Sequence, residues 1–169
     1  MSSSSAGVFL AAAAFVVFLV VQALVLNHIH LFGVATPLLY VYFVLLFRRN
    51  HPKWSILMWS FFLGICIDVF SNTPGVAAGS MTLLALFQPY VLEAFLTRDS
   101  EDNLKPGMRS LGVSKFIFYT IILVFLYTLA FFSLEAFNFF NWLQWLLCIG
   151  TSTLLTVVLI LVIENLRRQ

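Results

Sequence analysis

The basic residues of this chain fall into three short segments, and long apolar runs separate them. The nine residues are Arg48, Arg49, Lys53, then Arg98, Lys105, Arg109, Lys115, and finally Arg167 and Arg168. Every second connection between apolar runs is therefore basic, whereas the connections in between contain no Lys or Arg. Because moving positive charge across a bilayer is costly, cytoplasmic loops retain it. The pattern predicts six membrane-spanning helices with both termini in the cytoplasm.

The composition supports the same class. Of the 169 residues, 62% are hydrophobic and only 9% are charged, whereas a soluble domain has about 25% charged residues. Six helices of about 20 residues use about 120 residues, so we expect one all-α transmembrane domain over residues 1–169 and no second, soluble domain. The small formal charge of +2 gives no support for nucleic-acid binding.

The apolar runs set the expected spans at about 6–26, 31–47, 54–70, 74–96, 115–134 and 142–163. The polar start lacks the basic residues of a signal peptide, so we expect the first run to be retained as a span. Pro37 lies inside the second run and is expected to kink it. The longest connection, 97–114, is charged, and we expect either a solvated surface or a docking site for a cytoplasmic partner.

Asp68 is an ionisable residue in the outer part of the third expected span, where a carboxylate is costly. Thr73 followed by Pro74 is typical of a helix N-cap and first helical position. The next amides, of Gly75 and Val76, would then be unpaired donors at the positive end of the fourth helix. Asp68 is expected to accept from them as a structural staple. The alternatives are a partner-facing or ligand-binding carboxylate, and a proton-relay or catalytic carboxylate.

Gly75 and Gly79 form a Gly-x-x-x-Gly pattern at the start of the fourth span, and Ala78 and Ser80 lie beside them. Small residues at this spacing let membrane helices approach closely. We expect this face to pack within the chain, and packing against a helix of another protein is the alternative.

Gln88 and Pro89 lie in the inner half of the same span. Pro89 should release the carbonyl of Ala85, and Gln88 is a plausible donor to it. A kinked structural helix is the first interpretation, and a hinge or pocket wall is the second.

Enzyme signatures are absent from the sequence. It has no Gly-x-Ser-x-Gly, His-Glu-x-x-His or P-loop motif. His28 and His30 lack a third metal ligand and read as interfacial residues, so we expect no catalytic residue, metal or cofactor. A phosphate-binding cluster at Arg48, Arg49 and Lys53 is possible, but the positive-inside rule already explains these residues.

One stretch resembles a known family. A glycine, an apolar run to Asp68, then Ser71, then Pro74-Gly75 and a small-residue helix start resemble the MreD family, the rod shape-determining membrane proteins of bacteria. The chain length, the expected span count and the basic loop after the fourth span also agree. The resemblance implies a six-helix fold similar to the substrate-binding subunit of energy-coupling-factor transporters.

The resemblance also implies a function. Such a protein is a non-enzymatic scaffold of the cell-elongation complex in the bacterial cytoplasmic membrane. It binds an MreC-like single-span protein, and indirectly MreB-like filaments and a wall synthase with its penicillin-binding transpeptidase. By this analogy Asp68, Ser71, Pro74 and Gly75 shape a groove for the partner. The outer loops expected here are very short, so contacts outside the cell would come from helix flanks.

Two rival functions stay open at this point. One is a small-molecule-binding membrane subunit of a transporter, which predicts convergent polar groups and an ATPase partner. The intramembrane polar residues that the sequence offers are Asp68, Gln88, Gln144 and the cluster 151–153. The other is an intramembrane enzyme acting on lipid, for which Asp68 with distant histidines is a poor catalytic set.

Overall fold

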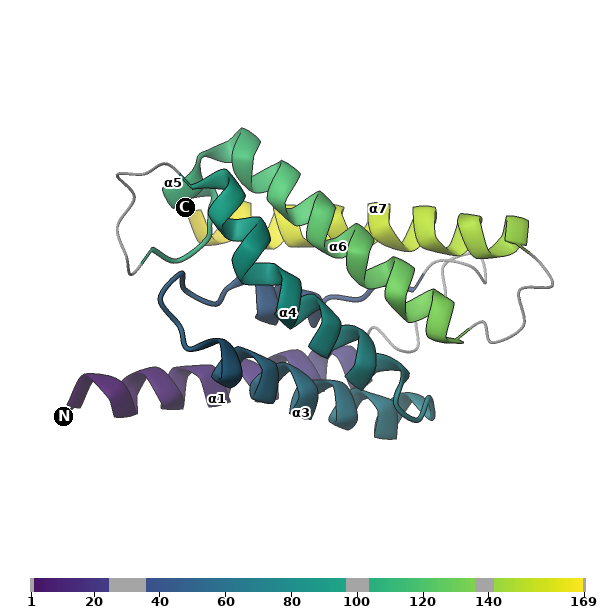
Figure 1. Cartoon of the computed structure of the whole chain (residues 1–169), viewed down its shortest axis with the longest axis horizontal. Helices are drawn as coiled ribbons and strands as arrows, with labels where there is room; N and C mark the ends of the chain where they lie inside the picture. The colour runs from purple at the N-terminus through teal and green to yellow at the C-terminus, as the bar shows by residue number, and fades with distance from the viewer. Residues whose placement is uncertain (1, 25–35, 97–103, 136–141, 169) are drawn as a thin grey trace.

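The computed structural model describes residues 2–24, 36–96, 104–135 and 142–168, and the remaining residues lie outside the description. Among the described residues the regular secondary structure is all helix, with turns and irregular segments between the helices. The elements are α1 (Ser2–Leu24), α2 (Val41–Leu45), α3 (Lys53–Ser71), α4 (Val76–Phe95), α5 (Met108–Leu111), α6 (Val113–Glu135) and α7 (Trp142–Arg168) (Figure 1).

Four of these helices, α3, α4, α6 and α7, are long and apolar enough to cross a membrane. The apolar stretch described within α1, Ala12–Gln22, is shorter. A bilayer core of about 30 Å needs about 20 helical residues. The chain is therefore an all-α, multi-pass membrane protein. The six spans of the sequence analysis remain a prediction.

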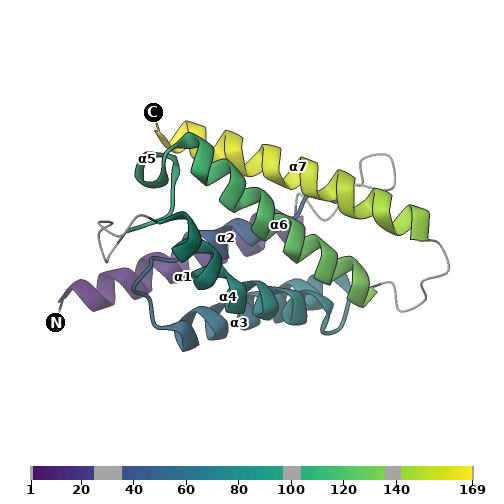
Figure 2. The same ribbon diagram turned by 45° about the horizontal axis from the view of Figure 1, so that its top comes forward.

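The long helices pack side by side around α4. Helix α4 packs between α3 and α6, α6 packs against α7, and α1 packs against α3. The short α2 contacts α1, α4 and α6 and lies inside the bundle (Figure 2). Both chain ends lie at the end of the bundle that carries α5 (Figure 1). We call this the basic end, because the connections with Lys and Arg lie there.

The second expected span is not one continuous helix, which corrects the prediction for 31–47. In its described part only Val41–Leu45 is α-helical, and residues 36–38 have no regular structure. Pro37 explains the break, because proline has no amide donor and disfavours helical geometry in the preceding residue. The effect of Pro37 is thus larger than the expected kink, and it leaves polar backbone groups in the bundle interior.

The other long helices begin and end close to the expected positions, except at the chain end. Helix α7 continues to Arg168, past the expected end at 163. Glu164 is therefore part of this helix, and its side chain is buried. Helix α5 lies in the expected loop 97–114, where Met108 and Leu111 are buried. Part of this loop therefore packs onto the basic end.

Helices α3 and α4 approach to backbone contact at Gly64. A Cβ atom at this position would lie 2.4 Å from the Cα atom of Ala78 and 2.8 Å from the carbonyl oxygen of Ala77. Only a glycine fits at such a crossing. At the other end of the pair, the ammonium group of Lys53 lies 4.5 Å from the centre of the Tyr90 ring, a distance suited to a cation–π contact.

The Gly75 and Gly79 pattern lies beside this close crossing, and its neighbour Ala78 is the residue that meets Gly64. The small-residue face at the start of α4 therefore packs within the chain through the buried Ala78 and Ser80, while the two glycines lie at its outer side. A Cβ atom at Gly75 would meet nothing within 4 Å. One at Gly79 would lie 3.3 Å from the Cδ1 atom of Leu134, the flexible end of a side chain. Both glycines are exposed.

We predict that Gly64→Ala destabilises the protein. The added methyl group must separate two helix backbones, and overpacking of this kind costs about 1–3 kcal/mol. The apparent unfolding temperature of the purified protein in detergent should fall. Gly150→Ala in α7 is the matched control, because a Cβ atom there meets nothing within 4 Å. Equal unfolding temperatures for the two variants would contradict the proposed close crossing.

Candidate functional site

The turn between α3 and α4 is fixed by two residues with positive φ. Asn72 ends α3 in the left-handed conformation, with φ 55° and ψ 38°, and its amide donates to the carbonyl of Asp68. Gly75, with φ 83°, precedes the first residue of α4, Val76. Asn and Gly tolerate this region best. Helix α4 therefore begins at Val76, and not at Pro74 with Thr73 as its N-cap, as the sequence predicts.

Both carboxylate oxygens of Asp68 are engaged within the chain. Oδ1 accepts from the amide of Ala77 at 2.8 Å and from the hydroxyl of Thr73 at 3.0 Å, and Oδ2 accepts from the amide of Ala78 at 2.9 Å. The side chain is only 6% exposed. The amides belong to the first turn of α4, where unpaired donors and the helix dipole favour an anion.

The donors to Asp68 differ from those expected. The expected donors are the amides of Gly75 and Val76, whereas the observed donors are those of Ala77 and Ala78. The shift follows from the later start of α4. Charge-assisted bonds of this kind are roughly twice as strong as neutral ones, so Asp68 holds the end of α3 firmly against the start of α4.

The other candidate residues around Asp68 lie toward the surface. Ser71 is the last residue of α3 and is half-buried, while Pro74, Gly75 and Gly79 are exposed. Val69 and Phe70 are also exposed, at 75% and 60%. We define the hairpin tip as Val69, Phe70, Pro74, Gly75 and Gly79. It is an apolar, small-residue surface held in place by a buried carboxylate.

A second polar group of residues surrounds the non-helical segment before α2. Gln22 of α1 donates from Nε2 to the carbonyl of Pro37 at 2.9 Å and accepts from the amide of Leu39 at 3.1 Å. Two hydroxyl groups of α7 accept hydrogen bonds from other backbone amides of this segment. The hydroxyl of Ser152 accepts from the amide of Thr36 at 3.2 Å, and that of Thr156 accepts from the amide of Leu38 at 3.1 Å. Side chains thus replace the missing helical bonds.

The other end of α2 is held in the same way. Gln88 of α4 donates from Nε2 to the carbonyl of Phe47 at 3.3 Å and to the hydroxyl of Tyr119 at 3.0 Å. Tyr119 in turn donates to the carbonyl of Leu45 at 3.3 Å. This corrects the expectation that Gln88 serves the carbonyl of Ala85. Pro89 lies within α4, which runs on to Phe95, and the hinge role stays a prediction.

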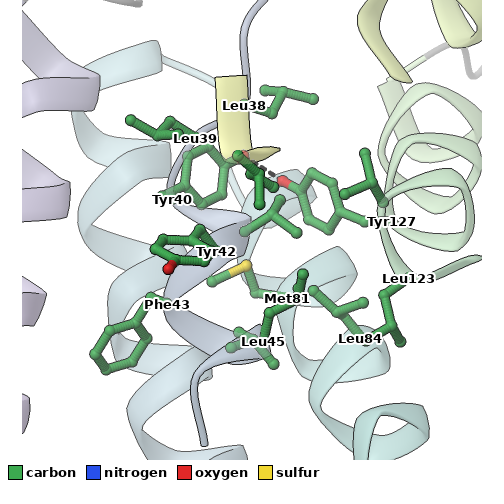
Figure 3. Close-up of a cluster of buried hydrophobic side chains, with 14 of the residues drawn as sticks. Leu38, Leu39, Tyr40, Tyr42, Phe43, Leu45, Met81, Leu84, Leu123 and Tyr127 are labelled. Atoms are coloured by element: carbon green, nitrogen blue, oxygen red, sulfur yellow. Dashed lines mark hydrogen bonds between the residues drawn. The ribbon is translucent and has the colours of Figure 1, made fainter. Parts of the chain in front are cut away.

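Two tyrosines meet in the core between these polar groups. The hydroxyls of Tyr40 and Tyr127 form a hydrogen bond, surrounded by apolar side chains that include Met81 and Leu84 (Figure 3). Nearby on α4 and α6, Gln88 Oε1 and Thr120 Oγ1 are buried, and neither has a partner among the described residues. The interior of the bundle therefore contains polar patches, although the sequence of each long helix is predominantly apolar.

Most of these interior residues escape the sequence analysis. It names Gln88 and the cluster 151–153, but not Gln22, Thr156 or Tyr119. One signal was present: a proline inside an apolar run frees backbone groups, which in a membrane need side-chain partners from other helices. Gln22 and Thr156 are such polar residues within apolar runs. His28 and His30 lie outside the described residues.

We predict that Asp68→Ala lowers stability by about 1–3 kcal/mol, because it leaves two buried amides of α4 without an acceptor. The measurement is thermal unfolding in detergent. Glu93→Ala removes an exposed carboxylate from the other end of α4 and should have little effect. If both variants unfolded at the wild-type temperature, the bonds of Asp68 would not be what holds the end of α3 to the start of α4.

We also predict that Gln22→Leu destabilises the bundle. Leucine keeps much of the volume but leaves the amide of Leu39 and the carbonyl of Pro37 unpaired, at a cost of about 1–3 kcal/mol for each buried group. Hydrogen exchange of the segment 36–40 in detergent should speed up. Gln144→Leu, at an exposed position of α7, is the control, and an equal response to both changes would refute this role.

Comparisons with known proteins add no family to this description. No protein-family model, no curated protein and no solved structure matches the chain. The resemblance of residues 68–79 to the MreD family therefore stays a prediction from the sequence, beside the observed all-α, multi-pass architecture.

Proposed function

We propose that this chain is a non-enzymatic scaffold of the bacterial cell-elongation complex in the cytoplasmic membrane. Its helices would bind the transmembrane helix and juxtamembrane part of an MreC-like partner. MreB-like filaments and the wall synthase with its penicillin-binding transpeptidase would be reached indirectly, and lateral peptidoglycan synthesis would be organised in this way. The observation that carries the proposal is that the carboxylate of Asp68 accepts hydrogen bonds from the first turn of α4. These bonds hold α3 and α4 together as one hairpin.

The bonding of Asp68 favours a positioning role over ligand binding. Its two oxygens already accept three hydrogen bonds from within the chain, so little capacity is left for a ligand. The pair is also held at the Gly64 crossing and by the contact between Lys53 and Tyr90. A preorganised surface loses less conformational freedom when a partner binds.

The hairpin tip supplies a suitable contact surface. Helices in lipid associate mainly through van der Waals packing, and glycine lets two backbones come close. Gly79 lies on the surface of α4, and the exposed Val69 and Phe70 lie near the end of α3. A partner helix could therefore pack against Gly79 with the apolar side chains beside it, in agreement with contacts made by helix flanks.

We predict that Gly79→Leu reduces recovery of the partner about tenfold, which corresponds to about 1.4 kcal/mol of lost binding. The tagged protein would be purified from its own cells in gentle detergent, and the partner quantified by mass spectrometry. Gly150→Leu adds the same side chain to α7, where there is open space, and should leave recovery unchanged. Equal recovery with both variants would reject the hairpin tip as the contact.

A small-molecule-binding transporter subunit remains the second candidate, because one observation favours it. Non-helical backbone at membrane depth often lines a binding site, and residues 36–38 supply such backbone here. Against it, the amides of Thr36, Leu38 and Leu39 are already bonded to side chains of the chain itself. Recovery of an ATPase pair and a bound small molecule in the same purification would favour this candidate over the scaffold.

A further inference from the structure

Three segments that are far apart in the sequence are tied together at the basic end. The amide of Arg49 donates to the carbonyl of Leu104 at 3.1 Å, which joins the connection after α2 to the segment before α5. The amide of Met108 donates to Glu164 at 3.2 Å, which joins α5 to the last turns of α7. The hydroxyl of Tyr42 also donates to Glu164. These bonds give the basic end a defined shape.

The same bonds bring basic side chains from all three segments together. Arg48 and Lys105 are exposed, and Arg167 keeps about half of its side chain exposed. Partial desolvation of its ammonium group is the main cause that lowers the pKa of Lys105, and the positive charges of Arg48 and Arg167 lower it further. The pKa of His51 is likewise lowered, first by burial and also by Arg48. Among the described residues, the charges that act on Lys105 and His51 are therefore positive.

The nearby carboxylate does not balance this charge. Glu164 is 5% exposed and already accepts from Tyr42 and Met108, with the guanidinium of Arg167 at 3.5 Å. Of the three cations, Arg167 is the one for which an ion pair with Glu164 is described. The positive-inside rule explains why basic residues gather on one side of a membrane. It does not explain why hydrogen bonds join the three segments that carry Arg48, Lys105 and Arg167 at one place.

An apolar stripe on α7 leads to the same end of the bundle. Leu154, Val158, Val162 and Leu166 are all at least half exposed and are spaced by four residues, which places them on one face of the helix. In a membrane this face contacts acyl chains. A lipid lying along it would bring its headgroup near Arg167 and the cations around it.

We propose that Arg48, Lys105 and Arg167 form a binding site for the phosphate of an anionic phospholipid whose acyl chains lie along α7. The guanidinium groups of Arg48 and Arg167 suit two-point contacts to phosphate oxygens, and Lys105 adds a compact charge. An anion would also relieve the mutual repulsion of the three cations. The site is independent of the scaffold function, since it involves neither the hairpin tip nor Asp68.

The test measures lipid binding to the full-length chain by native mass spectrometry in mild detergent, titrated with phosphatidylglycerol or phosphatidylcholine. The full chain is needed because Asp99, Glu101 and Asp102 precede Lys105 in the sequence. Phosphatidylglycerol should bind more tightly than phosphatidylcholine. Lys105→Gln should weaken phosphatidylglycerol binding about fivefold and leave phosphatidylcholine binding unchanged.

The matched control is Lys115→Gln, which removes an exposed lysine of α6 and should preserve the preference for phosphatidylglycerol. Equal effects of the two substitutions would mean that only diffuse charge is involved, and would overturn the site. A third titration uses glycerol 3-phosphate without lipid. Binding of this soluble ester at the same concentrations as phosphatidylglycerol would also overturn the lipid assignment.

Discussion

The bundle depends on one constraint: polar backbone groups in an apolar interior must find partners within the protein. Such groups lie on both sides of α2, at the break around Pro37 before it and at the end of this short helix, near Leu45 and Phe47, after it. Helices α1 and α7 supply the partners on one side through Gln22, Ser152 and Thr156. Helices α4 and α6 supply them on the other through Gln88 and Tyr119. The arrangement of these four helices around α2 thus follows from hydrogen bonding as much as from apolar packing.

Helix α4 contacts different neighbours along its length. At its start, strong bonds to Asp68 and the crossing at Gly64 fix it to α3. Farther along, Gln88 reaches α2 and α6. Helix α4 is therefore held to α3 at its start, and to α6 and the segment after α2 farther along.

The sequence predicts local features well and distant pairings poorly. Apolar length locates α3, α4, α6 and α7, and the short separation of Asp68 from the start of α4 makes a staple foreseeable. The donors shift by two residues because Gly75 takes a positive φ, which delays the helix. Pro37 signals that backbone groups need polar partners, but the sequence does not say that Gln22 and Thr156 supply them, because an apolar run gives the length of a helix and not the neighbour that each face meets.

The partners of the segment before α2 also set an order of events during synthesis. The staple at Asp68 joins residues 9 and 10 positions apart, so the α3–α4 hairpin can close as soon as it enters the membrane. The bond between Leu38 and Thr156 spans 118 positions, and its acceptor is in α7, which leaves the ribosome after the other described helices. Until then the amide of Leu38 needs water or a temporary partner, such as an insertion factor. A chain truncated before α7 would keep that need permanently and would be a natural substrate for membrane quality control.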